Sequence, residues 1–142
     1  MAGEQLLAEK PLFGARLNMA HPLSRGLVGC WLFNENGGVR AMDLSPYGNH
    51  GTLVGFASPP QRAFNGLLFN GVDKQVNCGN GPTLDIFATT KLLTLIAWVK
   101  IGDLTNDTRL VENHDGTNGY HVTFRPSLNN IRFTTASVKD YA

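Results

Sequence analysis

No stretch of this sequence approaches the roughly 20 consecutive apolar residues that a helix needs to cross a membrane. Its first residues, MAGEQLLAEKPLFGARL, also lack the basic start and long apolar core of a secretory signal. An excess of either charge is missing too, because 12 Lys and Arg stand against 11 Asp and Glu. Since phosphate binding needs clustered basic residues, the sequence predicts neither a nucleic-acid partner nor a membrane partner.

Cysteine is scarce, with Cys30 and Cys78 the two among 142 residues. Both fall in apolar, strand-like segments. A disulfide requires those strands to be neighbours, whereas the lack of a secretory signal favours two reduced, buried thiols that act as small apolar groups. No Cys–His spacing matches a zinc site.

A helical hydrophobic period is absent from residues 26–142, apart from a single helical turn expected near Asp85. Short runs of β-branched and aromatic residues alternate instead with Gly, Pro and Asn. This pattern predicts one all-β domain, an antiparallel sandwich or barrel. The expected strands are residues 27–33, 52–56, 67–70, 73–79, 92–101, 108–113, 119–125 and 130–137.

The longest apolar run, Leu92–Ile101, reads LLTLIAWVKI. Because neighbouring side chains of a strand point to opposite faces, both faces of this strand would be largely apolar. The run therefore predicts a central strand covered on both sides, with a short helix as the alternative.

Residues 1–25 follow neither a two-residue nor a 3.6-residue period and contain two prolines. They predict an extended N-terminal arm ahead of a domain at 26–142. The apolar side chains of such an arm must lie on the domain or on another molecule. The residues expected to bind a partner are Leu6, Leu7, Pro11, Leu12, Phe13 and Leu17.

Four motifs occur in order: GLVGCWLFNENGG (26–38), DLSPYGNHGTLVGF (43–56), GLLFNGVDKQVNCGN (66–80) and LTLIAWVKI (93–101). Together they resemble the first half of laminin-G-like, or concanavalin A-like, jelly-roll domains. The resemblance implies two curved antiparallel sheets packed face to face, with a concave face that binds sugars in some relatives. It also implies further strands after residue 142, so we expect a sandwich that is incomplete at its C-terminus or completed by a neighbouring subunit.

The family's acidic pair after Gly-Val reads Asp73-Lys74 here. A lysine ammonium repels calcium, so the sequence favours no bound metal and no other cofactor. If calcium binds, the candidate ligands are Asp43, Asn49 and Asp73.

The E-x-D-x-x-E strand expected of glycosidases with this fold is absent, and no nucleophile is placed beside a histidine, so we expect no enzyme activity. A sugar-binding face would need exposed aromatic rings, for which Trp98, Tyr120 and Phe124 are candidates. The opposing interpretation places Trp98 in the core.

Laminin-G-like domains that begin like HPLSRGLVGCW (21–31) resemble those of phage structural proteins. The sequence therefore predicts a non-catalytic virion component, a capsid decoration or tail-associated protein, whose arm docks on other subunits in a homo-oligomer or virion lattice. The alternative is a carbohydrate-binding module of a secreted or cell-surface protein, with glycans as partners.

Overall fold

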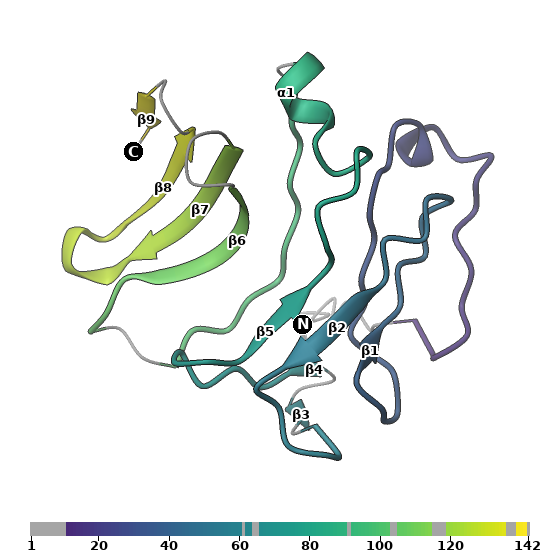
Figure 1. Ribbon diagram of the computed structural model, residues 1–142, viewed down its shortest axis with the longest axis horizontal. Coiled ribbons are helices and arrows are strands. Elements are labelled where there is room, and N and C mark those ends of the chain that lie inside the picture. Colours follow the sequence, from purple (N-terminus) through teal and green to yellow (C-terminus); the bar gives the residue numbers. More distant parts are fainter. Residues whose placement is uncertain are drawn as a thin grey trace, which may run out of the picture. The chain divides into compact units, whose positions relative to one another are not determined.

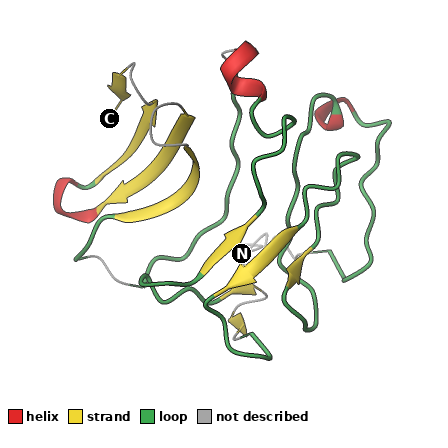
Figure 2. Ribbon diagram, in the orientation of Figure 1, coloured by secondary structure: helices red, strands yellow, loops and turns green. Residues whose placement is uncertain are grey.

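The computed structural model describes residues 11–60, 62–63, 66–90, 92–102, 105–114, 119–135 and 139–141. Strands make up most of the regular structure, and every strand pair is antiparallel (Figures 1 and 2). The prediction of an all-β fold is therefore confirmed. The chain divides into two compact units, residues 1–79 and 80–142, which are considered separately.

The first unit contains a three-stranded sheet with the order β1 (Arg40–Ala41), β2 (Gly51–Val54) and β5 (Gln75–Asn77). Burial alternates along β2, where Gly51 and Leu53 are buried and their neighbours are exposed. Ala41 on β1 is completely buried. Because buried and exposed side chains alternate along β2, this small sheet has one buried face. β2 overlaps the strand predicted at 52–56.

A second pairing in this unit joins β3 (Arg62–Ala63) to β4 (Gly66–Leu67). β3 lies between the predicted strands at 52–56 and 67–70 and was not among the expected strands. Asn70 and Gly71 form a turn in which the Asn70 side chain accepts hydrogen bonds from backbone amides of the next residues. The turn does not join a hairpin, since β4 and β5 are in different sheets.

The strand predicted at 27–33 is not formed. Its one pairing among the described residues is an isolated bridge between Trp31 and Asp43. The backbone of Cys30 instead donates to the Asp43 carboxylate and accepts from the amide of Leu44. A side chain has taken the place of a neighbouring strand, which local sequence propensity does not reveal.

The second unit contains a helix, α1 (Ile86–Thr90), near the predicted helical turn, and a four-stranded sheet (Figure 1). The sheet order is β6 (Thr108–His114), β7 (Gly119–Arg125), β8 (Asn130–Thr135) and β9 (Lys139–Tyr141). A 3₁₀ turn, η2 (Pro126–Leu128), joins β7 to β8. The predicted strands at 108–113 and 119–125 are thus confirmed in position, as are residues 130–135 of the strand predicted at 130–137, whose last two residues lie outside the described ranges.

This sheet has one apolar and one polar face, because paired residues on β6, β7 and β8 share a side. The apolar face carries Val111, Tyr120, Val122, Phe124, Ile131 and Phe133. On this face the rings of Tyr120 and Phe133 are in contact, with their centroids 6.1 Å apart, and Tyr120 is buried. A sheet of this kind needs a cover on its apolar side.

The predicted central strand at Leu92–Ile101 is not found. None of these residues belongs to a strand of the described sheets, and Trp98 is 85% exposed. The prediction failed because β propensity describes a segment's fitness for a sheet and says nothing about which strand will pair with it.

Candidate functional site

The described part of the N-terminal arm, residues 11–25, forms no strand and contains one 3₁₀ turn, η1 (Pro22–Ser24) (Figure 2). The arm is fastened at Pro11, whose carbonyl accepts a hydrogen bond from the side-chain amide nitrogen of Asn34 at 2.6 Å. Leu12 beside it is 86% exposed, and Phe13 is 59% exposed. Leu17 is half-buried, and Leu6 and Leu7 lie outside the described residues.

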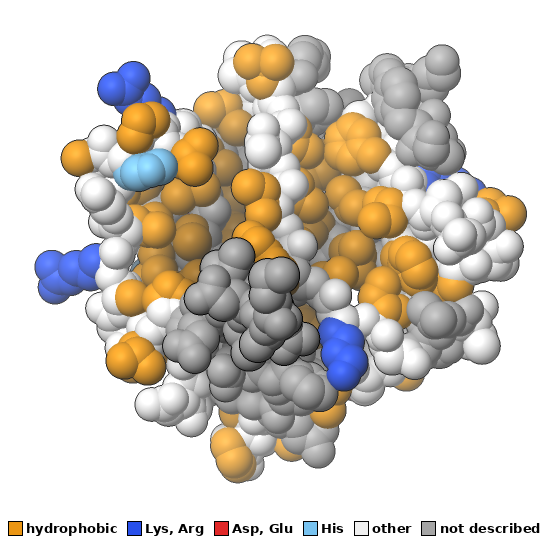
Figure 3. Space-filling model, turned by 180° about the vertical axis from the view of Figure 1, so that it is seen from behind, with side chains coloured by type: hydrophobic (Ala, Val, Ile, Leu, Met, Phe, Trp, Pro, Cys, Tyr) orange, Lys and Arg blue, Asp and Glu red, His pale blue; other side chains and the backbone are white. Residues whose placement is uncertain are grey.

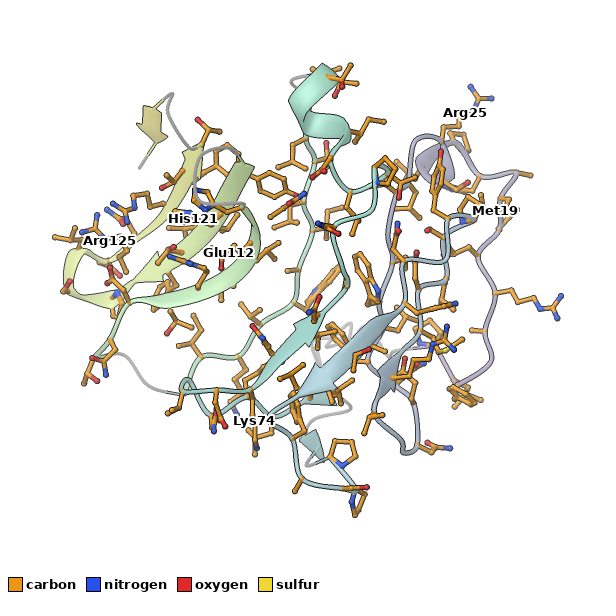
Figure 4. The ribbon with its side chains drawn as sticks, viewed as in Figure 1. Met19, Arg25, Lys74, Glu112, His121 and Arg125 are labelled. Carbon is orange, nitrogen blue, oxygen red and sulfur yellow. The ribbon has the colours of Figure 1, made fainter. Side chains whose placement is uncertain are left out.

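An open, mainly apolar pocket of about 260 Å³ lies between the arm and the loop after β1. The arm side includes Leu17 and Met19, the latter labelled in Figure 4. The loop side is formed by Leu44 and Pro46. The sequence interpretation had singled out Leu17 alone, and no local pattern links the arm to residues 44–46.

Beside this pocket, the buried Asp43 is the centre of a polar group that we call the Asp43 cluster: Cys30, Asp43, Ser45 and Asn49. One carboxylate oxygen accepts from the backbone amides of Cys30 and Ser45, both at 2.8 Å. The other oxygen accepts from the Ser45 hydroxyl at 2.6 Å and from the backbone amide of Asn49 at 2.8 Å. These four bonds occupy the acceptor positions of the carboxylate.

A second layer of hydrogen bonds surrounds the Asp43 cluster. The Trp31 indole donates to the carbonyl of Asn49, and the Asn49 side chain donates to the carbonyl of Val28, both at 2.8 Å. The backbone amide of Asp43 donates to Nδ1 of His50 at 3.0 Å. The cluster therefore fastens the loop at 43–50 to the chain at 28–31.

The electrostatics of Asp43 follow from this arrangement. Burial by itself would raise the pKa of Asp43, but hydrogen bonds from Ser45, Cys30 and Asn49 outweigh it and lower the pKa below its ordinary 3.8. The carboxylate therefore stays ionised while buried, because its charge is dispersed over four donors.

The oxygens of the calcium candidates have hydrogen-bond donors within the chain. Asp43 and Asn49 are adjacent, but Asp43 uses its oxygens within the chain. Asp73 belongs to a separate turn, where it accepts from the Asn70 side chain at 2.7 Å. Within the described ranges, no group of three His, Cys, Asp or Glu side chains has the spacing of a metal site.

Both cysteine thiols are free and half-buried in the first unit. Burial, and secondarily the charge of Asp43, raises the pKa of Cys30 and raises the pKa of Cys78 to about 11. The influence of Asp43 on both thiols indicates that Cys78, like the cluster member Cys30, lies near Asp43.

We expect Cys78 to react at least about tenfold more slowly with iodoacetamide at pH 8 than an ordinary thiol. Its thiolate fraction is about a hundredfold lower than at the ordinary value of 9.0, and higher intrinsic nucleophilicity restores part of that loss. Mass spectrometry of timed alkylation measures the rate, with the urea-unfolded protein as the control. Equal rates in the folded and unfolded states would contradict the raised pKa.

The three candidate aromatic residues are not equivalent. Trp98 is exposed, whereas Tyr120 is buried on the apolar face of the β6–β9 sheet and Phe124 on the same face is half-buried. Burial, followed by the charge of Asp85, raises the pKa of Tyr120 despite a hydrogen bond with Asn113. Tyr120 is thus a core residue.

The polar face of the β6–β9 sheet carries Glu112 and His121 as a direct cross-strand pair (Figure 4). Glu112 accepts from the Arg109 guanidinium at 2.6 Å. The rings of His114 and His121 lie 6.4 Å apart. Desolvation, and then the charge of Arg109, lowers the pKa of His121 below its ordinary 6.5, so His121 is mainly neutral at neutral pH.

No known protein family, curated protein or solved structure matches the chain. The resemblance to laminin-G-like domains therefore stays a prediction that rests on the four motifs. Within the part of the chain that the structure describes, no helix has the length and apolar character needed to cross a membrane.

Proposed function

We propose that this chain is a non-catalytic structural module that docks on neighbouring subunits through residues 1–25. The observation that carries the proposal is the exposure of large apolar side chains on the described part of the arm. These are Leu12, Phe13, Met19 and Leu23. Exposed apolar groups gathered on one segment are typical of an interaction surface.

The hydrogen bond between Asn34 and Pro11 supports this role. Asn34 holds Pro11 in place, so Leu12 and Phe13 start from a fixed point and less conformational entropy is lost when they bind. Full burial of each side chain at a subunit junction would contribute about 1.5–3 kcal/mol. The pocket between Leu17, Met19, Leu44 and Pro46 is a suitable receptor for an apolar side chain of the neighbouring subunit.

The surrounding fold would be a concanavalin A-like jelly roll. The β6–β9 sheet, with one apolar and one polar face, is consistent with a layer of such a sandwich. Within this proposal, the resemblance of residues 21–31 to phage structural proteins favours a capsid decoration or a tail-associated protein, located in the virion and surrounded by other protein subunits.

Leu12→Asp is expected to abolish docking, because it puts a charge into an apolar junction. Purified protein would be added to phage particles that lack it, and the fraction that sediments with the particles measured. Val72→Asp is the matched control, since Val72 is 88% exposed and lies outside the arm. Equal sedimentation of Leu12→Asp and the wild type would rule out docking through the arm.

A second candidate function is carbohydrate binding by a secreted or cell-surface module. The observation in its favour is the exposure of Trp98, since a flat exposed indole can stack on a sugar ring. We expect Trp98→Ala to remove glycan binding if this function holds. A glycan array with calcium present that gives no signal for the wild type would count against it.

A further inference from the structure

The segment Leu92–Ile101 has an unusual combination of backbone and side-chain properties. Its backbone contains no turn or bend (Figure 1). From Leu93 to Val99, no backbone amide or carbonyl makes a hydrogen bond with another residue that the structure describes. A strand-forming sequence with unpaired polar backbone groups is a template for pairing with another strand.

The side chains of this segment are exposed as well. Leu92 is 78% exposed and Ile96 is 74% exposed, and Trp98 is the most exposed of the three. Apolar side chains form large parts of the surface in the view of Figure 3. Pairing of the segment with a strand would satisfy its backbone and shield these side chains at the same time.

We propose that Leu92–Ile101 forms an antiparallel strand pair with the same segment of a second copy, around a two-fold axis at Ala97. In this register Trp98 lies opposite Ile96 of the other copy, and Lys100 lies opposite Thr94. The small side chain of Ala97 meets its own counterpart at the axis, where two larger groups would crowd each other.

The sequence of the segment is self-complementary in this register. Thr94 and Lys100 are its two polar residues, and an axis at Ala97 pairs each with the other in both halves. An axis one residue away, at Ile96 or at Trp98, places Lys100 opposite an apolar side chain instead, Leu92 or Ile96. The opposite face becomes wholly apolar, with Leu93 paired to Ile101 and Leu95 to Val99.

Charge also favours a second copy as the partner. Lys100 is the one charged residue of the segment, and the proposed register keeps the two copies of Lys100 apart at opposite ends of the pair. No like charges lie opposite each other. Because a two-fold axis closes the contact, the product is a dimer and not a filament. The inference is independent of arm docking, since the segment lies outside residues 1–25.

Disulfide trapping tests the register. In Ala97→Cys, the two Cα atoms across the axis would be about 4.5–5.5 Å apart, which a disulfide can bridge. In Leu95→Cys, the introduced cysteines would be offset by four residues, or about 13 Å, and cannot be bridged. We expect mild oxidation to give a reducible dimer band with Ala97→Cys alone, while Leu95→Cys and the wild type stay monomeric on the gel.

Sedimentation equilibrium of the full chain tests the dimer itself. Ala97→Lys places two charges at the axis and should raise the dimer dissociation constant at least about tenfold. The control Leu128→Lys adds the same charge to an exposed residue of η2 and should leave the constant unchanged.

Three results would overturn the proposal. A wild-type chain that stays monomeric at all concentrations would assign the segment to another partner or to none. Equal trapping of Leu95→Cys and Ala97→Cys would exclude the register. A mass that grows beyond the dimer with concentration would exclude closure around a two-fold axis.

Discussion

Asp43→Asn is expected to lower the free energy of unfolding of the first unit by about 3 kcal/mol or more. The amide keeps the size of the carboxyl group but turns one acceptor into a donor, which then faces two donors of the Asp43 cluster. Two charge-assisted hydrogen bonds, each worth roughly 1.5–3 kcal/mol, are lost in a buried position.

Urea unfolding followed by Trp31 fluorescence measures this effect. Trp31 and Trp98 are the two tryptophans, so a Trp98→Phe background isolates the signal of the first unit. Asp73→Asn is the control, because Asp73 is exposed and should change stability by less than about 0.5 kcal/mol. If the two variants unfold at the same urea concentration, the Asp43 cluster does not stabilise the fold.

The same carboxylate gives the stability a pH dependence. The pKa of Asp43 is lowered on folding, so its contribution is present above the ordinary value of 3.8 and is lost as the pH falls through the lower folded pKa. We expect the stability difference between wild type and Asp43→Asn to shrink over that acidic range. A difference that stays constant from neutral to strongly acidic pH would contradict the lowered pKa.

Gly119→Ala is expected to destabilise the β6–β7 pairing by about 3 kcal/mol or more. Gly119 has a φ of +123°, a conformation that residues with a Cβ atom rarely adopt. A Cβ there would overlap the carbonyl oxygen of Asn113 and come within 2.7 Å of the Cα of His114. Because these are backbone atoms of β6, the strand itself must shift.

The matched control is Gly102→Ala, because a Cβ at Gly102 meets nothing within 4 Å. Amide hydrogen exchange reports the result directly, through loss of protection in β6 and β7 for Gly119→Ala and retained protection for Gly102→Ala. Similar exchange in both variants would show that the hairpin tolerates the added carbon.

The strands that the sequence predicted well have their determinants close by in the chain. β7 and β8 alternate in character and are joined by a short connection in which Asn129 has a φ of +49°, a conformation that asparagine tolerates. The alternation of side chains and the short connection both depend on residues that are close together in the sequence. The sequence is therefore sufficient to locate β7 and β8.

The two strands that the sequence wrongly predicted depend on their hydrogen-bonding partners. For one segment these partners are side-chain and backbone groups farther along the chain, and for the other no partner strand lies in the described part of the chain. Residues 27–33 have the composition of a strand, but the backbone of Cys30 is bonded by Asp43 and Leu44. Leu92–Ile101 has strong β propensity, but no strand in the described part of the chain pairs with it. Propensity cannot supply either piece of information.

Some residues of the candidate site were named from the sequence. Leu12 and Phe13 were named as binding residues and are exposed, although their binding is still to be tested. Asp43 and Asn49 were named as weak calcium ligands because their residue types suit the ion, whereas in the structure the Asp43 carboxylate accepts hydrogen bonds from the Asn49 backbone amide and the Ser45 hydroxyl. Ser45 and Met19 were missed, since their roles depend on the folded loop at 43–50.

The Asp43 cluster also bears on the order in which the chain folds during synthesis. All of its donors, together with Trp31 and His50 around it, lie between residues 28 and 50. Contacts of such short sequence separation have a small loop-closure cost and can form quickly. The cluster can therefore close soon after residue 50 has left the ribosome, before the strands β6 to β9 have been translated.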